Sequence, residues 1–465
     1  MKSRKQSLQK LKIKYLINNH LPKIIKKNYR IYLCNSFFYL HLFFQCKRLH
    51  HFKKKQIMQR LFILIFAVLF IFPLQAKRVM TGIEVLREDN FKLLAGKKVG
   101  LITNPTGVDG NLKSTIDILF EAPNVKLVAL YGPEHGVRGD VYAGDKVVNA
   151  TDEKTGLPVY SLYGSTRKPT SEMLKGIDVL VYDIQDVGCR SYTYISTMGL
   201  AMEAAAENDI EFIVLDRPNP LGGEKIEGNV AEDPFISFVS QFKIPYIYGQ
   251  TCGELAMMLN EENALKKKCK LTVVKMKNWK RSMKWEDTGL EWVIASPHIP
   301  HKHSAYYYPV TGILGELGYV SVGVGYTLPF QVVAAPWIKA QEFADAMNRL
   351  ELPGIIFRPI FFTPFYGTLK GENCQGVQIH IVDFKKAHLS SVQFYIMQEI
   401  ARLYPDKKVF DNANKERFSM FDKVSGTDQI RILFQVNNSV SDIQHYWDKD
   451  IQSYSQLSKK YYLYH

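Results

Sequence analysis

The most constraining feature of the sequence is a series of short, uniformly apolar segments that alternate with amphipathic ones between residues 98 and 275. Residues 98–103 (KVGLIT), 177–184 (IDVLVYDI) and 211–215 (EFIVL) are apolar at successive positions, as strands buried on both faces are. Segments such as 199–208 (GLAMEAAAEN) have the spacing and composition of helices. The sequence therefore predicts an α/β fold, with a Rossmann-like parallel sheet and helices on both faces.

The same pattern predicts further strands and helices, and the regular alternation of strand and helix ends near residue 300. Additional strands are predicted at 126–131 and 271–275, and additional helices at 113–121 and 255–262. Later segments are predicted as strands at 319–330 and 376–382 and as helices at 340–350, 391–404 and 442–460. A chain of 465 residues is too long for one compact core. We predict a Rossmann-like domain over residues 77–300 and a smaller α+β C-terminal domain over residues 301–465.

The net charge of +15 is confined to the first 57 residues, which contain 15 Lys or Arg and no Asp or Glu. Acidic and basic side chains balance in the rest of the chain. A neutral body has no electrostatic attraction for phosphate backbones, so no nucleic-acid partner is expected.

Residues 58–76 have the organisation of a signal peptide. A short basic start is followed by an apolar run at 61–74, which is too short to span a bilayer comfortably, and by the small residue Ala76. We predict an exported protein, periplasmic or secreted, with no stable membrane anchor after cleavage. Residues 1–57 are interpreted as a mistranslated upstream extension, and the alternative is a membrane-anchoring arm.

No cofactor or metal site is predicted. The segment after the first strand, 103–107 (TNPTG), lacks the G-x-G-x-x-G of a dinucleotide site. His298, His301 and His303 have suggestive spacing, but neighbouring prolines make this stretch extended, which does not gather three imidazoles. The S-x-x-K string at 165–168 is set aside, because the other motifs of penicillin-binding serine enzymes are absent or in reversed order.

Polar side chains that follow the predicted strands are the strongest sign of a functional site. In an open parallel sheet, ligands bind beyond the carboxyl ends of the strands, so these side chains should share one rim. The candidates are Asn104 after the first strand; Glu134 and His135 after the second; Asp183, Gln185, Asp186, Arg190 and Tyr192 after the third; Asp216, Arg217 and Asn219 after the next; and His298, on a second wall with Tyr306, Tyr307 and Tyr308.

Glu134 is the leading candidate for a catalytic acid. Pro133 and Gly136 predict a stiff turn that aims its carboxyl group into the cleft. A carboxyl group in a poorly hydrated cleft is suited to general acid catalysis. The alternative is a solvated or helix-capping glutamate.

The remaining candidates each have a structural alternative. Asp183 or Asp186 could act as a base or orient a substrate hydroxyl, or could accept backbone N–H groups of the turn. Arg190 and Arg217 could clamp a carboxylate with the guanidinium fork, or could pair with a neighbouring aspartate. Tyr192 could stack on a sugar ring or simply pack in the core.

Seven longer strings occur in a characteristic order along the chain. They are GLITNPTGVD (100–109), YGPEHGVRGD (131–140), TGLPVYSLYG (155–164), DVLVYDIQDVGCRSYTYISTM (178–198), LDRPNPLGG (215–223), YGQTCGELAMMLN (248–260) and SPHIPH (296–301). Together they resemble the NamZ-type exo-β-N-acetylmuramidases, from about residue 81 to the C-terminus. Several long motifs in register make this resemblance far more specific than any single short one.

The resemblance implies an exported glycoside hydrolase, built from a Rossmann-like catalytic domain and a smaller C-terminal domain, that uses no nucleotide. Its substrate would be a peptidoglycan-derived saccharide, from whose non-reducing end it removes terminal β-linked N-acetylmuramic acid. Glu134 matches the leading catalytic residue of the family, and the matching cleft positions are His135, Asp183, Gln185, Asp186, Arg190, Asp216 and Arg217. The alternative is a non-catalytic peptidoglycan- or sugar-binding protein that uses the same cleft.

Two expectations combine the resemblance with the chemistry. Glycoside cleavage needs an acid at the leaving oxygen and a second group that supplies or replaces the nucleophile, so Glu134 would act with Asp183 or Asp186. Arg190 or Arg217 would bind the lactyl carboxylate of muramic acid. Residues 296–300 (SPHIP) and 310–318 (VTGILGELG) depart from the wording of many relatives, and we expect them to shape substrate acceptance.

Overall fold

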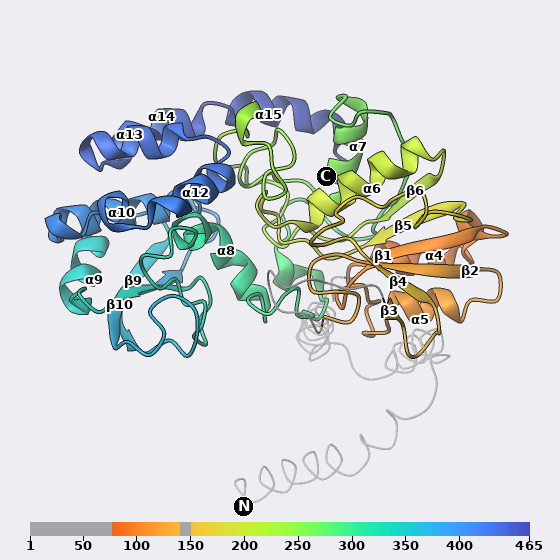
Figure 1. Cartoon of the computed structure of the whole chain (residues 1–465), viewed down its shortest axis with the longest axis horizontal. Coiled ribbons are helices and arrows are strands. Elements are labelled where there is room, and N and C mark those ends of the chain that lie inside the picture. Colours follow the sequence, from red (N-terminus) through yellow and green to blue (C-terminus); the bar gives the residue numbers. More distant parts are fainter. Residues whose placement is uncertain (1–76, 140–149) are drawn as a thin grey trace, which may run out of the picture. The chain divides into compact units, whose positions relative to one another are not determined.

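The computed structural model describes residues 77–139 and 150–465, and its larger sheet has seven strands (Figure 1). The strand order is β3-β4-β2-β1-β5-β6-β7, with every neighbouring pair parallel except β3 and β4. The strands are β1 (Lys98–Thr103), β2 (Lys126–Gly132), β3 (Ala150–Thr151), β4 (Pro158–Ser161), β5 (Val179–Asp183), β6 (Glu211–Leu215) and β7 (Lys270–Val274). The predicted signal peptide and upstream extension lie outside the described residues.

Both faces of this sheet are apolar because alternate side chains of each central strand enter different cores. In β5, Val179 and Val181 pack in one cluster, whereas Leu180 and Tyr182 pack in the other. The first cluster is covered by α4 (Gly82–Glu88) and α5 (Thr115–Phe120), and the second by α6 (Tyr194–Glu207) and α7 (Cys252–Glu261). Helices therefore cover both faces, as the uniformly apolar strands predict.

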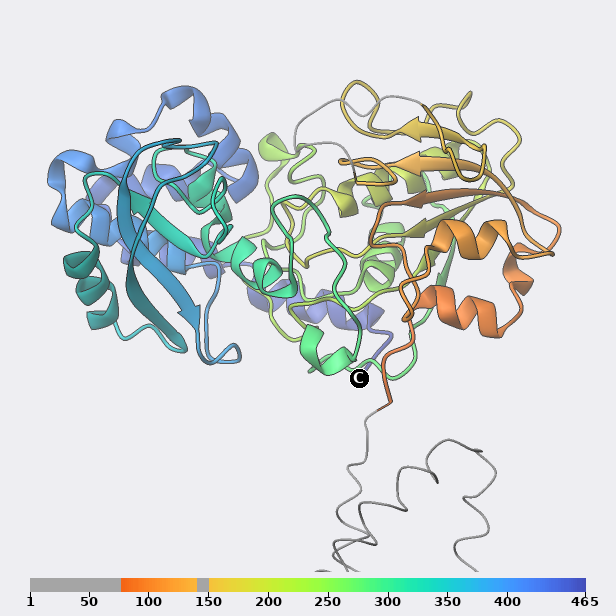
Figure 2. The same cartoon turned by 90° about the horizontal axis from the view of Figure 1, so that it is seen from below.

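The C-terminal domain is smaller and contains a three-stranded antiparallel sheet in the order β8-β10-β9 (Figure 2). Its strands are β8 (Val332–Ala335), β9 (Ile355–Phe362) and β10 (Cys374–Ile381). The helices are α8 (Lys302–Gly315), α9 (Ala340–Arg349), α10 (Val392–Leu403), α11 (Val409–Asn412), α12 (Phe418–Ser425), α13 (Gln429–Asn437), α14 (Val440–Asp448) and α15 (Ile451–Ser458).

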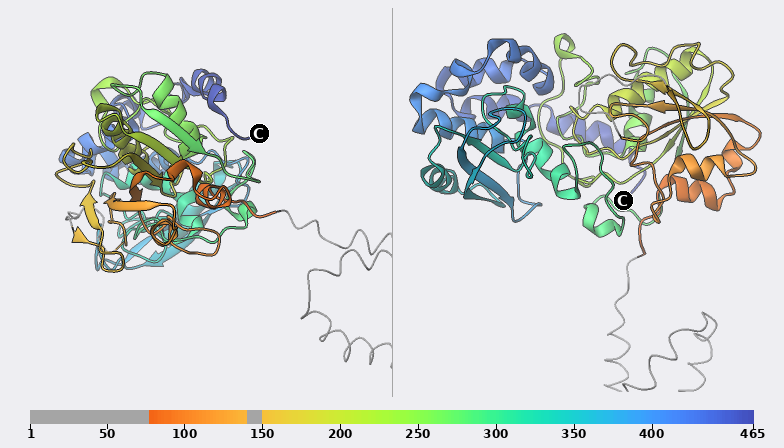
Figure 3. Two further views of the ribbon diagram at one scale, coloured as in Figure 1. Left: turned by 90° about the vertical axis from the view of Figure 1, so that its right-hand side faces the viewer. Right: turned by 60° about the horizontal axis from the view of Figure 1, so that its bottom comes forward.

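The end of the chain returns to the larger sheet domain (Figure 3). After α15, the hydroxyl group of Tyr464 donates to Oδ2 of Asp216 at 2.6 Å, at the end of β6. The backbone N–H of Leu463 donates to Oε1 of Glu254 in α7 at 2.8 Å. These contacts, one partly buried and one buried, attach the last residues to α7 and to the end of β6.

The predicted α/β class is confirmed, and most predicted elements of the first domain correspond to observed ones. The predicted strand at 319–330 is wrong, because Gly323 and Gly325 have φ angles of +84° and +95° and turn the chain there. Only a single bridge, between Ser321 and Ala334, pairs this segment with the small sheet. Within the part of the chain that the structure describes, none of the helices has the length and apolar character needed to span a bilayer.

Candidate active site

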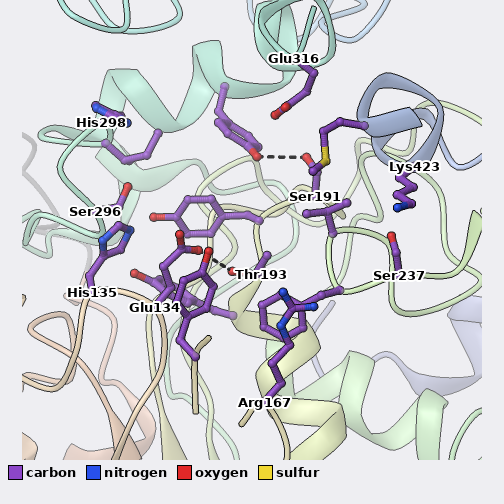
Figure 4. A pocket seen from close by; sticks show the side chains of 18 of the residues that line it. Glu134, His135, Arg167, Ser191, Thr193, Ser237, Ser296, His298, Glu316 and Lys423 are labelled. Atoms are coloured by element: carbon purple, nitrogen blue, oxygen red, sulfur yellow. Dashed lines mark hydrogen bonds between the residues drawn. The ribbon is translucent and has the colours of Figure 1, made fainter. Parts of the chain in front are cut away.

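A cavity of about 440 Å³ lies where loops beyond the carboxyl ends of the larger sheet meet residues of the C-terminal domain (Figure 4). Its lining combines six tyrosine and phenylalanine rings with ten polar or charged side chains, and a concave site with convergent polar groups is a candidate small-molecule site. The lining residues are Glu134, His135, Tyr163, Arg167, Ser191, Tyr192, Thr193, Tyr194, Ser237, Phe238, Val239, Ser296, His298, Ile299, Tyr308, Glu316, Phe330, Met420 and Lys423.

Glu134 reaches this pocket from the turn that follows β2. His135 and Gly136 have φ angles of +73° and +76°, and the N–H of Gly136 donates to the carbonyl of Pro133 at 3.0 Å. This tight turn leaves the Glu134 side chain half-buried, and its Oε2 accepts a hydrogen bond from Oγ1 of Thr193 at 3.0 Å. Because Thr193 is the N-cap of α6, the carboxyl group lies near the amino end of that helix.

Tyrosine rings form one wall of the pocket. The ring centroid of Tyr192 lies 4.8 Å from that of Tyr194 and 5.5 Å from that of Tyr308, both edge-to-face. The hydroxyl groups of Tyr308 and Ser191 are 3.1 Å apart. Such a wall offers apolar ring faces with polar tips, a combination that suits a sugar. The predicted position of Tyr192 in the cleft is therefore observed, together with Tyr308 from α8.

Two histidines complete the Glu134 side of the pocket. The ring of His298 stacks on Tyr366, and its Nε2 lies 3.1 Å from the tyrosine hydroxyl. Burial lowers the pKa of His298, and the nearby imidazole of His135 acts in the same direction. His298 is therefore held in the neutral form near pH 7, where it can both donate and accept a hydrogen bond.

His301 and His303 lie outside the pocket lining and contact other side chains. His301 precedes α8 and its Nδ1 lies 3.2 Å from the hydroxyl of Ser304, whereas Nε2 of His303 lies 3.5 Å from Glu286. Across residues 77–139 and 150–465, no group of three His, Cys, Asp or Glu side chains is arranged to hold a metal ion.

Asp183 and Arg217 meet each other rather than Glu134. Nε of Arg217 donates to Oδ1 of Asp183 at 2.5 Å, and the other carboxylate oxygen accepts from Oγ1 of Thr115 at 2.5 Å. Both side chains are buried, and neither lines the large cavity. Arg217 instead borders a small cavity of about 20 Å³. The placement supports the internal Arg–Asp alternative and not a carboxylate clamp.

Asn104, Gln185 and Asp186 brace the loops beneath the pocket. Oδ1 of Asn104 accepts the N–H of Thr106 at 3.0 Å, and Nε2 of Gln185 donates to the carbonyl of Pro218 at 2.7 Å. Oδ2 of Asp186 accepts from the hydroxyl of Tyr248 at 2.5 Å and from the N–H of Gly188 at 2.7 Å. All three residues are buried and outside the lining of the large cavity, and Gln185 borders the small one. The structure therefore does not place Asp186 with Glu134 in the lining of the large cavity.

Arg190 is a structural tie between the two domains. Its fully buried guanidinium group donates to carbonyl oxygens of Asn229 and Ile244, at 2.7 and 2.6 Å, and of Val424 and Ser425 in α12, at 3.1 and 2.8 Å. Burial lowers its pKa to about 10. These donors are already engaged, so the predicted clamp on a substrate carboxylate is not supported by the position of Arg190.

Asp216 and Asn219 also hold loops. Asp216 accepts from Oγ1 of Thr251 at 2.7 Å and from the Tyr464 hydroxyl, while Oδ1 of Asn219 accepts the N–H of Leu221 at 2.9 Å. Both are buried outside the cavity lining. Of the twelve predicted site residues, the pocket contains Glu134, His135, Tyr192 and His298.

The buried carboxyl group of Asp186 predicts a specific pH dependence of stability. Burial raises its pKa to about 7, so the folded state binds this proton more tightly than the unfolded state. The contribution of protonated Asp186 to the free energy of unfolding is therefore fully present below about pH 4 and is lost as the pH rises through about 7. In the Asp186→Asn variant, urea unfolding across this range should show a flatter profile than the parent protein. Parallel profiles would contradict this assignment.

Several pocket residues could not be predicted from the sequence, either because the strand that they follow was not predicted or because they come from the C-terminal domain. Tyr163 and Arg167 follow the short strand β4, and Arg167 lies inside the S-x-x-K string that was set aside. Glu316 and Lys423 come from the C-terminal domain, and no local pattern indicates that they face the first domain. Two signals in the sequence bear on these four residues: the family strings include Tyr163, and the segment 310–318, which is expected to shape substrate acceptance, includes Glu316.

The comparisons with known proteins agree with this architecture. The family model for the N-terminal part of the exo-β-N-acetylmuramidase NamZ matches residues 99–303, and the model for its C-terminal part matches residues 306–464. The peptidoglycan β-N-acetylmuramidase NamZ of Bacillus subtilis (strain 168) is 48% identical over 387 residues, which cover 83% of this chain and 92% of that protein.

Two solved structures of DUF1343 family proteins from Bacteroides fragilis NCTC 9343 are also similar. One has a TM-score of 0.81 and 68% sequence identity, and the other a TM-score of 0.66 and 29% identity. Each match covers 83% of this chain and 99% of the other. The chain therefore belongs to the exo-β-N-acetylmuramidase NamZ family and is a glycoside hydrolase.

Proposed function

We propose that this chain is an exo-acting hydrolase that releases terminal β-linked N-acetylmuramic acid from peptidoglycan fragments, with Glu134 as the general acid. The B. subtilis relative is named as a peptidoglycan β-N-acetylmuramidase. The observation that carries the catalytic assignment is the position of Glu134, whose half-buried carboxyl group lines a pocket walled by tyrosines. An acid in this position can protonate the leaving oxygen while the sugar ring packs against the aromatic wall.

The test is hydrolysis of a chromogenic N-acetylmuramic acid β-glycoside and of peptidoglycan disaccharides by the chain from Lys77 onward. We expect release of chromophore and of free N-acetylmuramic acid, identified by mass spectrometry. Longer fragments should lose only the terminal sugar. Binding without release, or cleavage inside longer glycans, would contradict the proposed exo-hydrolase activity.

We also propose that the enzyme works outside the cytoplasm, in the periplasm or after secretion. The signal-peptide pattern of residues 58–76 supports this location, as does a substrate class that belongs to the cell wall. N-terminal sequencing of the protein from a bacterial expression host should find a mature chain that begins near Lys77. An uncleaved chain in the cytoplasmic fraction would refute the proposal.

A further inference from the structure

Arg190 and Arg217 are engaged inside the protein and lie outside the pocket lining, so neither is placed to bind the proposed substrate carboxylate. N-acetylmuramic acid differs from N-acetylglucosamine by a lactyl ether on C3, whose free form carries a carboxylate. Among the described residues, the arginine and lysine side chains that line the pocket are Arg167 and Lys423. Recognition of the lactyl carboxylate must therefore be sought at one of these two side chains.

Arg167 is held in a defined position at the pocket. Its guanidinium carbon lies 4.5 Å from the ring centroid of Phe238, a contact that favours a fixed orientation of the planar group. The ring of Phe238 in turn lies 6.0 Å from that of Tyr163. Arg167 is exposed and has no ion pair within residues 77–139 and 150–465, whereas its neighbour Lys168 pairs with Glu203 and Glu207.

Tyr163 connects Arg167 to the catalytic carboxyl group. The pKa of Tyr163 is raised to about 12, first by burial and then by the charge of Glu134, while the guanidinium of Arg167 acts in the opposite direction. Tyr163 is thus within electrostatic reach of both groups. Figure 4 shows Glu134 and Arg167 directed into the same pocket, with Lys423 entering from another side near Ser237.

We propose that Arg167 forms a carboxylate-binding subsite that recognises the lactyl group of N-acetylmuramic acid and so distinguishes it from N-acetylglucosamine. The inference rests on the proposed function and adds the source of its selectivity. The guanidinium fork of Arg167 matches both oxygens of a carboxylate, and the ring of Phe238 supports it with its centroid 4.5 Å from the guanidinium carbon. In this arrangement Glu134 protonates the glycosidic oxygen on C1, and Arg167 binds the lactyl group on C3 of the same sugar ring.

The test is direct binding of N-acetylmuramic acid and N-acetylglucosamine, measured by calorimetry on the parent protein and on Arg167→Met. The substitution keeps much of the side-chain length and removes the charge from an exposed position, so the fold should be retained. We expect the dissociation constant for N-acetylmuramic acid to rise about 10- to 100-fold, as for loss of a charged bidentate contact, with that for N-acetylglucosamine unchanged. Arg167→Lys should restore part of the difference.

Lys423→Met is the matched control, because it removes a positive charge from the same pocket. It should leave the ratio of the two dissociation constants unchanged. An unchanged ratio in Arg167→Met, an equal loss in Lys423→Met, or a parent protein that binds both sugars equally would each overturn the subsite. Failure of the proposed function would be seen separately, as a parent protein that releases no chromophore from the β-glycoside.

Discussion

Replacing Glu134 by glutamine should lower the turnover of a peptidoglycan disaccharide about 10²- to 10⁴-fold while leaving the protein folded. The amide cannot give a proton to the leaving oxygen, but its carbonyl can still accept the hydrogen bond from Thr193. Unfolding by urea should therefore be nearly unchanged. Activity within a few-fold of the parent protein would reject Glu134 as the acid.

The leaving group sharpens this experiment. A nitrophenolate leaves with little protonation, whereas a sugar alkoxide needs a proton, so the loss in Glu134→Gln should be much smaller on a nitrophenyl β-glycoside than on the disaccharide. Glu316→Gln is the matched control, since it neutralises another carboxyl group that lines the same pocket. Its effect should not depend on the leaving group. If both variants respond alike, a general change in pocket charge explains the loss better than acid catalysis.

The sequence predicted the first sheet well because its strands are apolar on both faces. The predicted strand at 211–215 coincides with β6 (Glu211–Leu215), and the predicted segment at 177–184 contains β5 (Val179–Asp183). The small sheet was harder to predict. β9 (Ile355–Phe362) lies at the edge of its sheet and exposes Ile356, Arg358 and Phe361, so its pattern does not resemble that of a buried strand.

The site was predicted in part for a physical reason. Residues after parallel strands do gather at one edge, and Glu134 and Tyr192 enter the pocket from there. However, charged groups at that edge can satisfy one another, as Asp183 and Arg217 do, or can bond to the backbone, as Arg190 does. Sequence order does not distinguish a charge that faces a ligand from one that is paired internally. The C-terminal contribution from Lys423 depends on domain packing, which local patterns do not encode.

Breaking the pair between Asp183 and Arg217 should have the largest effect on stability. Asp183→Ala would leave a buried guanidinium group without its carboxylate and the hydroxyl of Thr115 without its acceptor. Loss of one partner of a buried ion pair costs about 3–5 kcal/mol of unfolding free energy. The matched control is Asp233→Ala, whose ion pair with Lys243 is exposed and should contribute no more than about 1 kcal/mol. Urea unfolding at neutral pH measures both.

The same variant decides what Asp183 does, because a structural and a catalytic aspartate fail in different ways. A structural Asp183 predicts a protein that unfolds at lower urea concentration, yet whose folded fraction retains substantial turnover at low temperature. A catalytic Asp183 predicts the reverse, with near-parental stability and turnover reduced by orders of magnitude. The bidentate contact to Arg217 and the absence of Asp183 from the cavity lining favour the first result. In that case the role of the ion pair is to hold the segments after β5 and β6 together, and acid catalysis depends on Glu134 and the other residues that line the pocket.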